Sequence, residues 1–378
     1  MRSFTDRVSE IDISGIRKMF EAAGTDSINL GLGEPDVPMP AHIGDAAVDA
    51  IRAGHTRYTP GAGMPELREA LSEKFLRDNN VRVSPDEIIV TAGASEALHI
   101  VLQALVEPGD DVLIPDPGFV SYAALSHIAG GRVIGVPLVD LALDPDVVSE
   151  RITRNTKVLI VNSPSNPCGS VQSRREMQAF AELAEDYDFT IISDEVYEFL
   201  IYEGEHVSPA EFTDNVVTVN ATSKTYAMTG WRLGYLAARP EYIEQFHKVH
   251  QYVQACAGSV AQYAALAAIT GPQDCVCEMR EQFRERRDIL LRGLSELGVE
   301  CPTPAGAFYL FPRVGDGDRV SAELAGRGVI TVPGSSFGAH GSEHIRLSYA
   351  ASKTDIACAI ERMAGVSMSG VSIPGRSV

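Results

Sequence analysis

The sequence predicts an α/β fold in which a mostly parallel sheet is covered by helices on both faces. From residue 87 to about 238, short apolar runs rich in β-branched residues alternate with segments of helical spacing. Runs of this kind, joined by helices, are typical of parallel strands that are buried on both faces. After Glu241 the pattern is mainly helical up to about Leu297, and a second, smaller α/β portion follows.

Each expected element can be given a residue range. Helical spacing is found at 11–23, 65–78, 95–106, 121–129 and 175–187. Strands are expected at 88–91, 111–114, 132–136, 157–161, 189–192 and 216–219, and in the last portion at 306–311 and 344–349. Residues 365–378 are rich in serine and glycine, so we expect a flexible tail there.

The composition is that of an ordinary globular protein, and it argues against several classes of function. Of the 378 residues 45% are hydrophobic, yet no run approaches the roughly 18 apolar residues that a membrane helix needs. A formal net charge of −19 argues against nucleic-acid binding, which requires a basic face. The six cysteines form no paired C-x-x-C set, so we expect reduced thiols, no metal site and a cytoplasmic protein.

Residues 220–235 contain the strongest candidate for a reactive group. Lys224 lies among small hydroxyl residues directly after an apolar run, and Arg232 follows a glycine and the single tryptophan of the chain. Burial and a neighbouring cation both lower the pKa of a lysine, and the neutral amine can then attack a carbonyl. Alone, the motif is more typical of a solvated lysine in a surface loop.

Three further motifs lie at strand ends, where open α/β sheets bind their ligands. Residues 91–96 join a strand to a helix through small residues and offer backbone N–H groups to a phosphate. Residues 162–169 form a loop with two prolines that presents Asn166. Residues 193–197 place Asp194 where it can pair with a cationic ring nitrogen. Taken singly, each is also compatible with ordinary packing, a rigid turn or a helix cap.

Arg346 lies in the middle of an expected strand, between two apolar residues. This placement is unusual for arginine and fits two-point capture of a carboxylate. With Lys224 as an amine, Asp194 as a partner for a protonated pyridine and Arg232 beside a phosphate cradle, these groups are the inventory for pyridoxal phosphate chemistry.

The sequence resembles the class I aminotransferases, which belong to the fold-type I pyridoxal-phosphate enzymes. The resemblance runs from about residue 14 to residue 350. It rests on residues 30–36, Tyr58-Thr59-Pro60, Glu66-Leu67-Arg68, Gly93-Ala94-Ser95, 163–169, 193–197, 223–234 and Arg346, which occur in the family's order. It implies a large cofactor-binding domain at 41–281 and a smaller α/β domain built from both chain ends, at 1–40 and 282–364.

The resemblance implies a role for each matching residue. Lys224 would carry the cofactor as a Schiff base and move the α-proton, and Asp194 would hold the pyridinium nitrogen. Tyr197 and Asn166 would hold the cofactor's phenolic oxygen. The phosphate would be bound by Gly93, Ala94, Ser95, Ser223 and Arg232, and Tyr58 would reach the phosphate of a neighbouring subunit in a homodimer. Phe119 would stack on the ring, and Gly33, Asn166 and Arg346 would receive the substrate α-carboxylate.

The implied reaction is ping-pong transfer of an amino group from an L-amino acid to 2-oxoglutarate. The motifs look most like prokaryotic aspartate and aromatic aminotransferases, and aspartate is the first choice. Ser95 stands where some bacterial aspartate enzymes carry a lysine, so an aromatic or broad preference stays open. A pyridoxal-phosphate C–S lyase and a non-enzymatic ligand sensor are the rivals. The sequence departs from the family at Ala221, Cys168 and Phe119, without losing a group that the chemistry requires.

Overall fold

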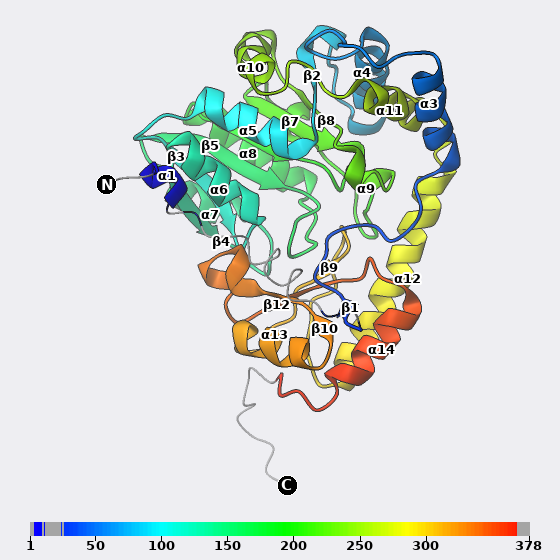
Figure 1. Ribbon diagram of the computed structural model, residues 1–378. Coiled ribbons are helices and arrows are strands. Elements are labelled where there is room, and N and C mark those ends of the chain that lie inside the picture. Colours follow the sequence, from blue (N-terminus) through cyan, green and yellow to red (C-terminus); the bar gives the residue numbers. More distant parts are fainter. Residues whose placement is uncertain (1–3, 10, 12–23, 25, 369–378) are drawn as a thin grey trace.

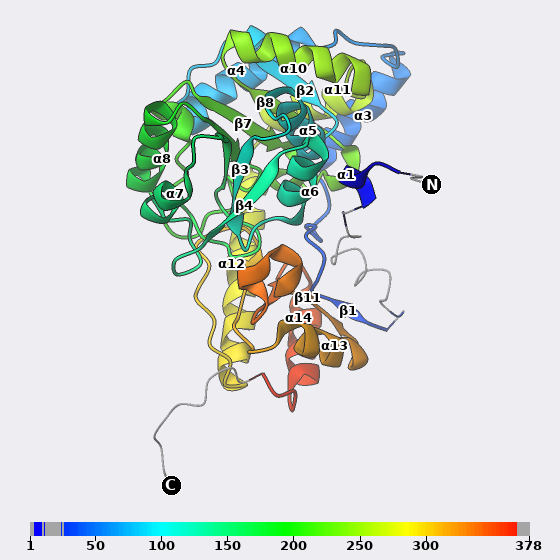
Figure 2. The same ribbon diagram turned by 90° about the vertical axis from the view of Figure 1, so that its left-hand side faces the viewer.

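The computed structural model describes residues 4–9, 11, 24 and 26–368 (Figures 1 and 2). A seven-stranded sheet with helices around it forms the upper part of Figure 1, and a smaller group of strands and helices lies below. The long helix α12 (Asp274–Glu296) runs from one part to the other. The helix expected at 11–23 falls almost entirely outside the described residues.

The large sheet is mostly parallel, as predicted. Its strand order is β2-β8-β7-β6-β5-β3-β4. The strands are β2 (Ile88–Thr91), β3 (Asp111–Asp116), β4 (Arg132–Pro137), β5 (Thr156–Asn162), β6 (Thr190–Asp194), β7 (Val216–Ala221) and β8 (Gly234–Ala237). β8 runs antiparallel to both of its neighbours, and the other neighbouring pairs are parallel. β8 is missing from the strands expected from the sequence, because its first two residues belong to the Lys224 motif at 220–235.

Helices cover both faces of this sheet because successive strand residues point to opposite sides. In β5, Val158 and Ile160 pack with α5, α6 and α10, whereas Leu159 and Val161 pack with α7 and α8. All four side chains are fully buried, which explains the continuous apolar run. The helices around the sheet are α3 (Ala41–Arg52), α4 (Pro65–Asn79), α5 (Ala94–Leu105), α6 (Val120–Ala129), α7 (Pro145–Arg151), α8 (Arg174–Asp186), α10 (Pro240–Val253) and α11 (Ser259–Thr270).

Local sequence signals set several of these helix ends. α8 begins with a capping box, in which Ser173 and Glu176 satisfy each other's backbone N–H groups. Pro65 starts α4, where the missing N–H of proline costs nothing. The remaining short elements are α1 (Asp6–Ser9), α9 (Thr222–Thr225), η1 (Pro85–Glu87), η2 (Pro209–Glu211), η3 (Thr229–Trp231), η4 (Gly334–Phe337) and η5 (Ala339–Gly341).

The smaller part combines segments from both ends of the chain. β1 (Ile28–Asn29) pairs in parallel with β10 (Val329–Ile330), which comes near the other end of the chain. A second small sheet has the order β11-β12-β9. Its strands are β9 (Tyr309–Leu310), β11 (Val332–Pro333) and β12 (Ile345–Ser348), and the helices of this part are α13 (Gly317–Gly326) and α14 (Lys353–Met363). β9 is shorter than the strand expected at 306–311.

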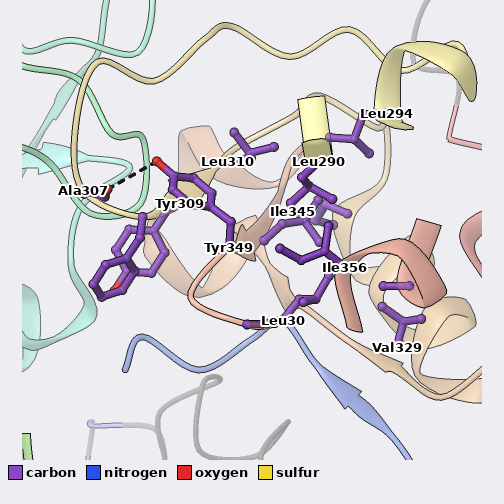
Figure 3. Close-up of a cluster of buried hydrophobic side chains, with 14 of the residues drawn as sticks. Leu30, Leu290, Leu294, Ala307, Tyr309, Leu310, Val329, Ile345, Tyr349 and Ile356 are labelled. Carbon is purple, nitrogen blue, oxygen red and sulfur yellow. Dashed lines mark hydrogen bonds between the residues drawn. The ribbon is translucent and has the colours of Figure 1, made fainter. Parts of the chain in front are cut away.

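One apolar core holds the smaller part together (Figure 3). Leu290 and Leu294 of α12 meet Ile345 of β12, Ile356 of α14 and Leu30, which follows β1. All of these side chains are fully buried. The core explains why two segments so far apart in the sequence lie together, since each supplies part of a single apolar surface.

Residues 369–378 of the flexible tail expected at 365–378 lie outside the described residues, so the tail stays a prediction. Val366 and Met368 are 7% and 5% exposed and belong to the core of the smaller part. The serine- and glycine-rich composition hid these two apolar contacts. The domain limit expected at residue 282 lies inside a helix, because α12 is continuous there. The domain limits at 41 and 282 stay a prediction.

The fold brings five strand ends to one edge of the large sheet. The carboxyl ends of β2, β3, β5, β6 and β7 lie at the same edge because these strands are parallel, and the segments that follow them face the smaller part. Among the described residues, none of the helices combines the length and the apolar character needed to cross a membrane.

Candidate active site

A cavity of about 270 Å³ lies at this edge, between the large sheet and the smaller part. The sequence-predicted residues that line it are Gly33, Ala94, Ser95, Phe119, Asn166, Asp194, Tyr197, Ser223, Lys224, Arg232 and Arg346. Two predicted residues do not line it. Gly93 lies immediately behind Arg232, and Tyr58 borders a separate hollow on the surface.

The amine of Lys224 points into the cavity from α9, the single helical turn that follows β7. Its Nζ donates a hydrogen bond to the carbonyl oxygen of Gly33, 2.6 Å away. Burial lowers the pKa of Lys224 to about 8; the carboxylate of Glu34 opposes this shift, and Arg346 and Arg232 add to it. Lys224 is therefore closer to its neutral, nucleophilic form than a lysine in water.

Asp194, the last residue of β6, supplies a buried carboxyl group to the cavity. Tyr122 donates its hydroxyl hydrogen to Oδ2 of Asp194 over 2.7 Å, and the Asn162 side chain donates to the Asp194 backbone carbonyl over 2.9 Å. Burial raises the pKa of Asp194 to about 6, although the hydrogen bond from Tyr122 favours the charged form. A cationic ring nitrogen beside this carboxyl would stabilise its ionised state.

A concave corner forms where the turn after β2 meets Arg232. Gly93 has a φ of +85°, and a Cβ there would lie 2.6 Å from a guanidinium nitrogen of Arg232, so only glycine leaves this space open. Ala94 and Ser95 begin α5, whose first N–H groups have no partners within the helix. Ser223 lines the same cavity. A helix N-terminus beside a guanidinium is suited to a phosphate group.

Arg346 enters the cavity from β12 of the smaller part and is only 1% exposed. It donates to Oδ1 of Asn166 over 2.9 Å and to the carbonyl oxygen of Gly31 over 2.6 Å. The rings of Tyr309 and Phe337 lie 4.5 and 4.9 Å from its guanidinium carbon. Its Nε is buried without a partner among the described residues, so the guanidinium still has donors for an anion.

Two tyrosines, Tyr197 and Tyr309, line the cavity together with Lys224 and Arg346. The hydroxyl groups of Tyr197 and Tyr309 are 2.8 Å apart, and burial raises the pKa of both. A Cβ on Gly33 would lie 2.2 Å from the Tyr309 hydroxyl, so only glycine fits at position 33 without displacing Tyr309. The ring of Phe119 also lines the cavity and makes an edge contact with Tyr122.

These groups fit pyridoxal phosphate at three separate points. The cradle at Gly93, which a Cβ would fill, matches a phosphate. The buried carboxyl group of Asp194 matches a protonated pyridine nitrogen. The buried amine of Lys224 matches a group that binds an aldehyde.

The comparisons with known proteins agree with this fit. The family model for aminotransferase class I and II matches residues 25–363. The chain belongs to this family. A probable aspartate aminotransferase of Methanocaldococcus jannaschii is 47% identical over 362 residues, which are 93% of this chain and 96% of that protein.

Solved structures give the same result. The aspartate aminotransferase of Thermus thermophilus with maleate superposes with a TM-score of 0.94 at 40% identity, covering 97% of this chain and all of that one. An aromatic aminotransferase of Pyrococcus horikoshii has a TM-score of 0.88 at 39% identity, covering 92% of this chain and 97% of that one. The protein is thus a pyridoxal-phosphate-dependent aminotransferase with the fold-type I architecture, and an amino acid and a 2-oxo acid are the substrates of such an enzyme.

The structure adds residues of the aminotransferase site that sequence reasoning missed. Tyr122 and Tyr309 line the cavity and contact Asp194 and Tyr197, respectively. Both lie in segments rich in apolar residues, where a tyrosine is indistinguishable from ordinary core. Asn162 could have been found, because it ends β5 beside Asp194, its partner in the sheet register.

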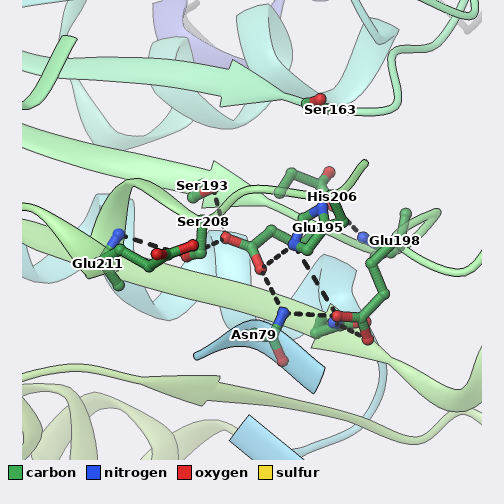
Figure 4. Close-up of polar contacts among 12 residues, drawn as sticks. Asn79, Ser163, Ser193, Glu195, Glu198, His206, Ser208 and Glu211 are labelled. Carbon is green, nitrogen blue, oxygen red and sulfur yellow. Dashed lines mark hydrogen bonds and ion pairs between the residues drawn. The ribbon is translucent and has the colours of Figure 1, made fainter. Parts of the chain in front are cut away.

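A second polar cluster is built around Glu195 and Glu198, which follow Asp194 in the sequence (Figure 4). Glu195 accepts hydrogen bonds from Ser193, Ser208 and His206. Burial disfavours the charged forms of Glu195 and His206, but their mutual attraction outweighs it and lowers the pKa of Glu195 while raising that of His206. Glu198 accepts from Lys74, Asn79 and Asn220. This cluster ties the strands behind Lys224 to α4.

The charge of Glu34 provides a test of the electrostatics around Lys224. Glu34→Gln removes an anion that stabilises the ammonium form, so the pKa of Lys224 should fall below about 8. The measurement is the pH dependence of imine formation between the cofactor-free protein and pyridoxal phosphate. Its midpoint should move to lower pH than in the unmodified protein. A midpoint that rises or stays in place would show that Glu34 does not act on this amine.

Proposed function

We propose that this aminotransferase moves the amino group of L-aspartate to 2-oxoglutarate by a ping-pong mechanism. The observation that carries the proposal is the convergence of Lys224, Asp194 and Arg346, from three separate segments, on one cavity. The preference for aspartate is supported by two relatives: the probable aspartate aminotransferase of Methanocaldococcus jannaschii and the aspartate aminotransferase of Thermus thermophilus.

The cofactor would be held at both ends of its ring. In this proposal Gly93, Ala94, Ser95, Ser223 and Arg232 bind the phosphate, and Asp194 keeps a proton on the ring nitrogen. Tyr197 and Asn166 hold the phenolic oxygen, and Phe119 covers one ring face. When bound, pyridoxal phosphate supplies an electron sink for the negative charge that develops at the substrate Cα.

The residues of this chain would then bind the substrate and move its proton. Arg346 takes the α-carboxylate through donors that Asn166 and Gly31 leave free. Asn166 fixes the guanidinium, and the backbone of Gly33 borders the carboxylate. The neutral amine of Lys224 would remove the hydrogen from Cα as a general base. Its lowered pKa suits this task near neutral pH.

The preference for aspartate places a demand on the site. A second carboxylate needs a second cation, and among the described cavity-lining residues the cations are Lys224, Arg232 and Arg346. Ser95 offers none. The apolar lining by Leu32 and Phe119, with the likeness to an aromatic aminotransferase, favours an aromatic amino acid as the second candidate donor.

The proposed enzyme is a homodimer in which each subunit completes the other's site. Tyr58 is 88% exposed and lies away from the cavity of its own chain. The hollow that it borders, about 560 Å³ in volume, includes Arg57, Gln254 and Ser259. Tyr252 and Val253, which directly precede Gln254 in the sequence, are exposed and add apolar surface. The six free cysteines support the proposed cytoplasmic location.

Replacement of Lys224 tests the assignment of the reactive amine. Lys224→Ala should lower turnover by at least about a thousandfold, because the amine that binds the cofactor and moves the α-proton is lost. Visible absorbance of the bound cofactor should change in the same variant. Lys248→Ala, which removes an exposed lysine paired with Glu244, is the matched control and should retain full activity. Full activity in Lys224→Ala would contradict the proposed mechanism.

A panel of amino donors with 2-oxoglutarate tests the substrate. We expect kcat/KM for aspartate to exceed that for phenylalanine by about tenfold or more, since a recognised second carboxylate adds differential binding. Turnover of phenylalanine at an equal or higher rate would replace aspartate by an aromatic donor and leave the reaction class intact. Release of pyruvate and ammonia from a sulfur amino acid without an acceptor would indicate lyase chemistry.

Shared sites can be tested by mixing two inactive variants. If Tyr58 completes the site of the neighbouring subunit, Lys224→Ala in one subunit and Tyr58→Ala in the other disable the same site of a mixed dimer. The second site of that dimer should then have both residues intact. After equal amounts are unfolded together and refolded, activity should recover to about a quarter of the unmodified level, as random pairing of subunits requires. Either variant refolded alone is the control. No recovery in the mixture would mean that Tyr58 acts within its own subunit.

A further inference from the structure

A buried carboxylate–histidine pair lies directly behind the proposed phosphate corner. Glu96 is in the first turn of α5, next to Ser95, and His250 is in the last turn of α10. The Glu96 side chain is 7% exposed and that of His250 is fully buried. Nδ1 of His250 lies 3.0 Å from Oε1 of Glu96, and Nε2 lies 2.9 Å from the carbonyl oxygen of Gly61. The other Glu96 oxygen accepts from the backbone N–H of Ala92.

The partners of His250 determine the charge of this pair. The carbonyl oxygen of Gly61 can only accept a hydrogen bond, so Nε2 must carry a hydrogen. Nδ1 then either donates to an ionised Glu96 or accepts from a protonated one. In both arrangements the two side chains share one proton, and together they carry no net charge.

This neutrality matters because Glu96 is at the same helix N-terminus as the proposed phosphate. An anion in the first turn and a phosphate at the helix end are both attracted to the positive end of the helix dipole. An ionised Glu96 without a counter-charge would repel the phosphate through a poorly screened interior. His250 cancels that repulsion, while Glu96 keeps the hydrogen bond that shapes the turn around Gly93.

His250 also anchors the loop that carries Tyr58. Its bond to Gly61 fixes the loop from one side. From the other side, the amide of buried Gln262 donates to the Thr59 hydroxyl and accepts from the Met64 backbone. The phosphate turn and the Tyr58 loop are therefore connected through a single histidine.

We propose that Glu96 and His250 form a positioning pair that sets the affinity of the enzyme for the cofactor phosphate. Glu96 shapes the turn before α5, and His250 removes the charge of Glu96 from the phosphate corner and holds the Tyr58 loop against it. The inference rests on the proposed function, which places the phosphate at Gly93 to Ser95.

Substitution by glutamine separates charge from shape. His250→Gln keeps a donor for Gly61 or Glu96 but cannot carry a positive charge. The Glu96 charge then has no counter-charge beside it and repels the phosphate, so the Kd for pyridoxal phosphate should rise about tenfold to a hundredfold. The Kd for pyridoxal, which has no phosphate, should change by less than about threefold, since the repulsion acts on the phosphate alone. Both constants are measured on the full-length enzyme by titration of visible absorbance.

A second substitution should then restore binding. In His250→Gln with Glu96→Gln the repelling charge is absent, so the Kd for pyridoxal phosphate should return to within about threefold of the unmodified enzyme. Glu96→Gln alone keeps an acceptor for Ala92 and a donor for Nδ1 of His250, and it should bind pyridoxal phosphate normally. His247→Gln, on the same helix and also against Gly61, is the matched control and should leave both constants unchanged.

Three results would overturn the pair's role. These are equal weakening of pyridoxal and pyridoxal phosphate in His250→Gln, absence of rescue in the double variant, and a large loss of phosphate affinity in Glu96→Gln alone. The last result remains decisive even if His250→Gln does not fold. Failure of the unmodified protein to bind pyridoxal phosphate at all would instead overturn the proposed function, and this inference with it.

Discussion

The site depends on one constraint: an amine, a carboxyl group and a guanidinium must all be buried around the same cavity. Removing Lys224, Asp194 and Arg346 from water disfavours their charged forms, and each pKa moves accordingly, down for Lys224 and Arg346 and up for Asp194. The fold supports this burial with hydrogen bonds: Tyr122 donates to Asp194, Asn166 accepts from Arg346, and backbone carbonyls accept from Lys224 and Arg346. The same desolvation that costs stability prepares these groups for chemistry with a charged cofactor and substrate.

The sheet explains how such groups come together. Parallel strands end at one edge, so the residues after β2, β5, β6 and β7 meet although they are far apart in sequence. Arg346 reaches the cavity from the smaller part, whose core joins segments from both ends of the chain (Figure 3). The cavity is therefore lined by both parts, and the hydrogen bond from Arg346 to Asn166 joins them, whereas its bond to Gly31 lies within the smaller part.

Charge neutralisation recurs around the site. Glu195 is paired with His206, Glu198 with Lys74, and Glu96 with His250. Each pair lies behind an element that carries a site residue: the end of β6 for the first two, and the start of α5 for the third. In a chain with a net charge of −19, such pairing keeps buried carboxylates from competing with the anionic groups that the cavity is suited to bind.

The sequence by itself determined the class of fold, the family and most of the cavity lining. Strand periodicity and residues such as Lys224, Asp194 and Arg346, in a recognisable order, are local signals that survive without coordinates. Only the tertiary structure revealed Tyr122 and Tyr309, the antiparallel β8, the burial of Val366 and Met368, and the pairing of Glu96 with His250. These depend on contacts between segments separated by tens to hundreds of residues, and a buried tyrosine or histidine has no local pattern that distinguishes it from ordinary core.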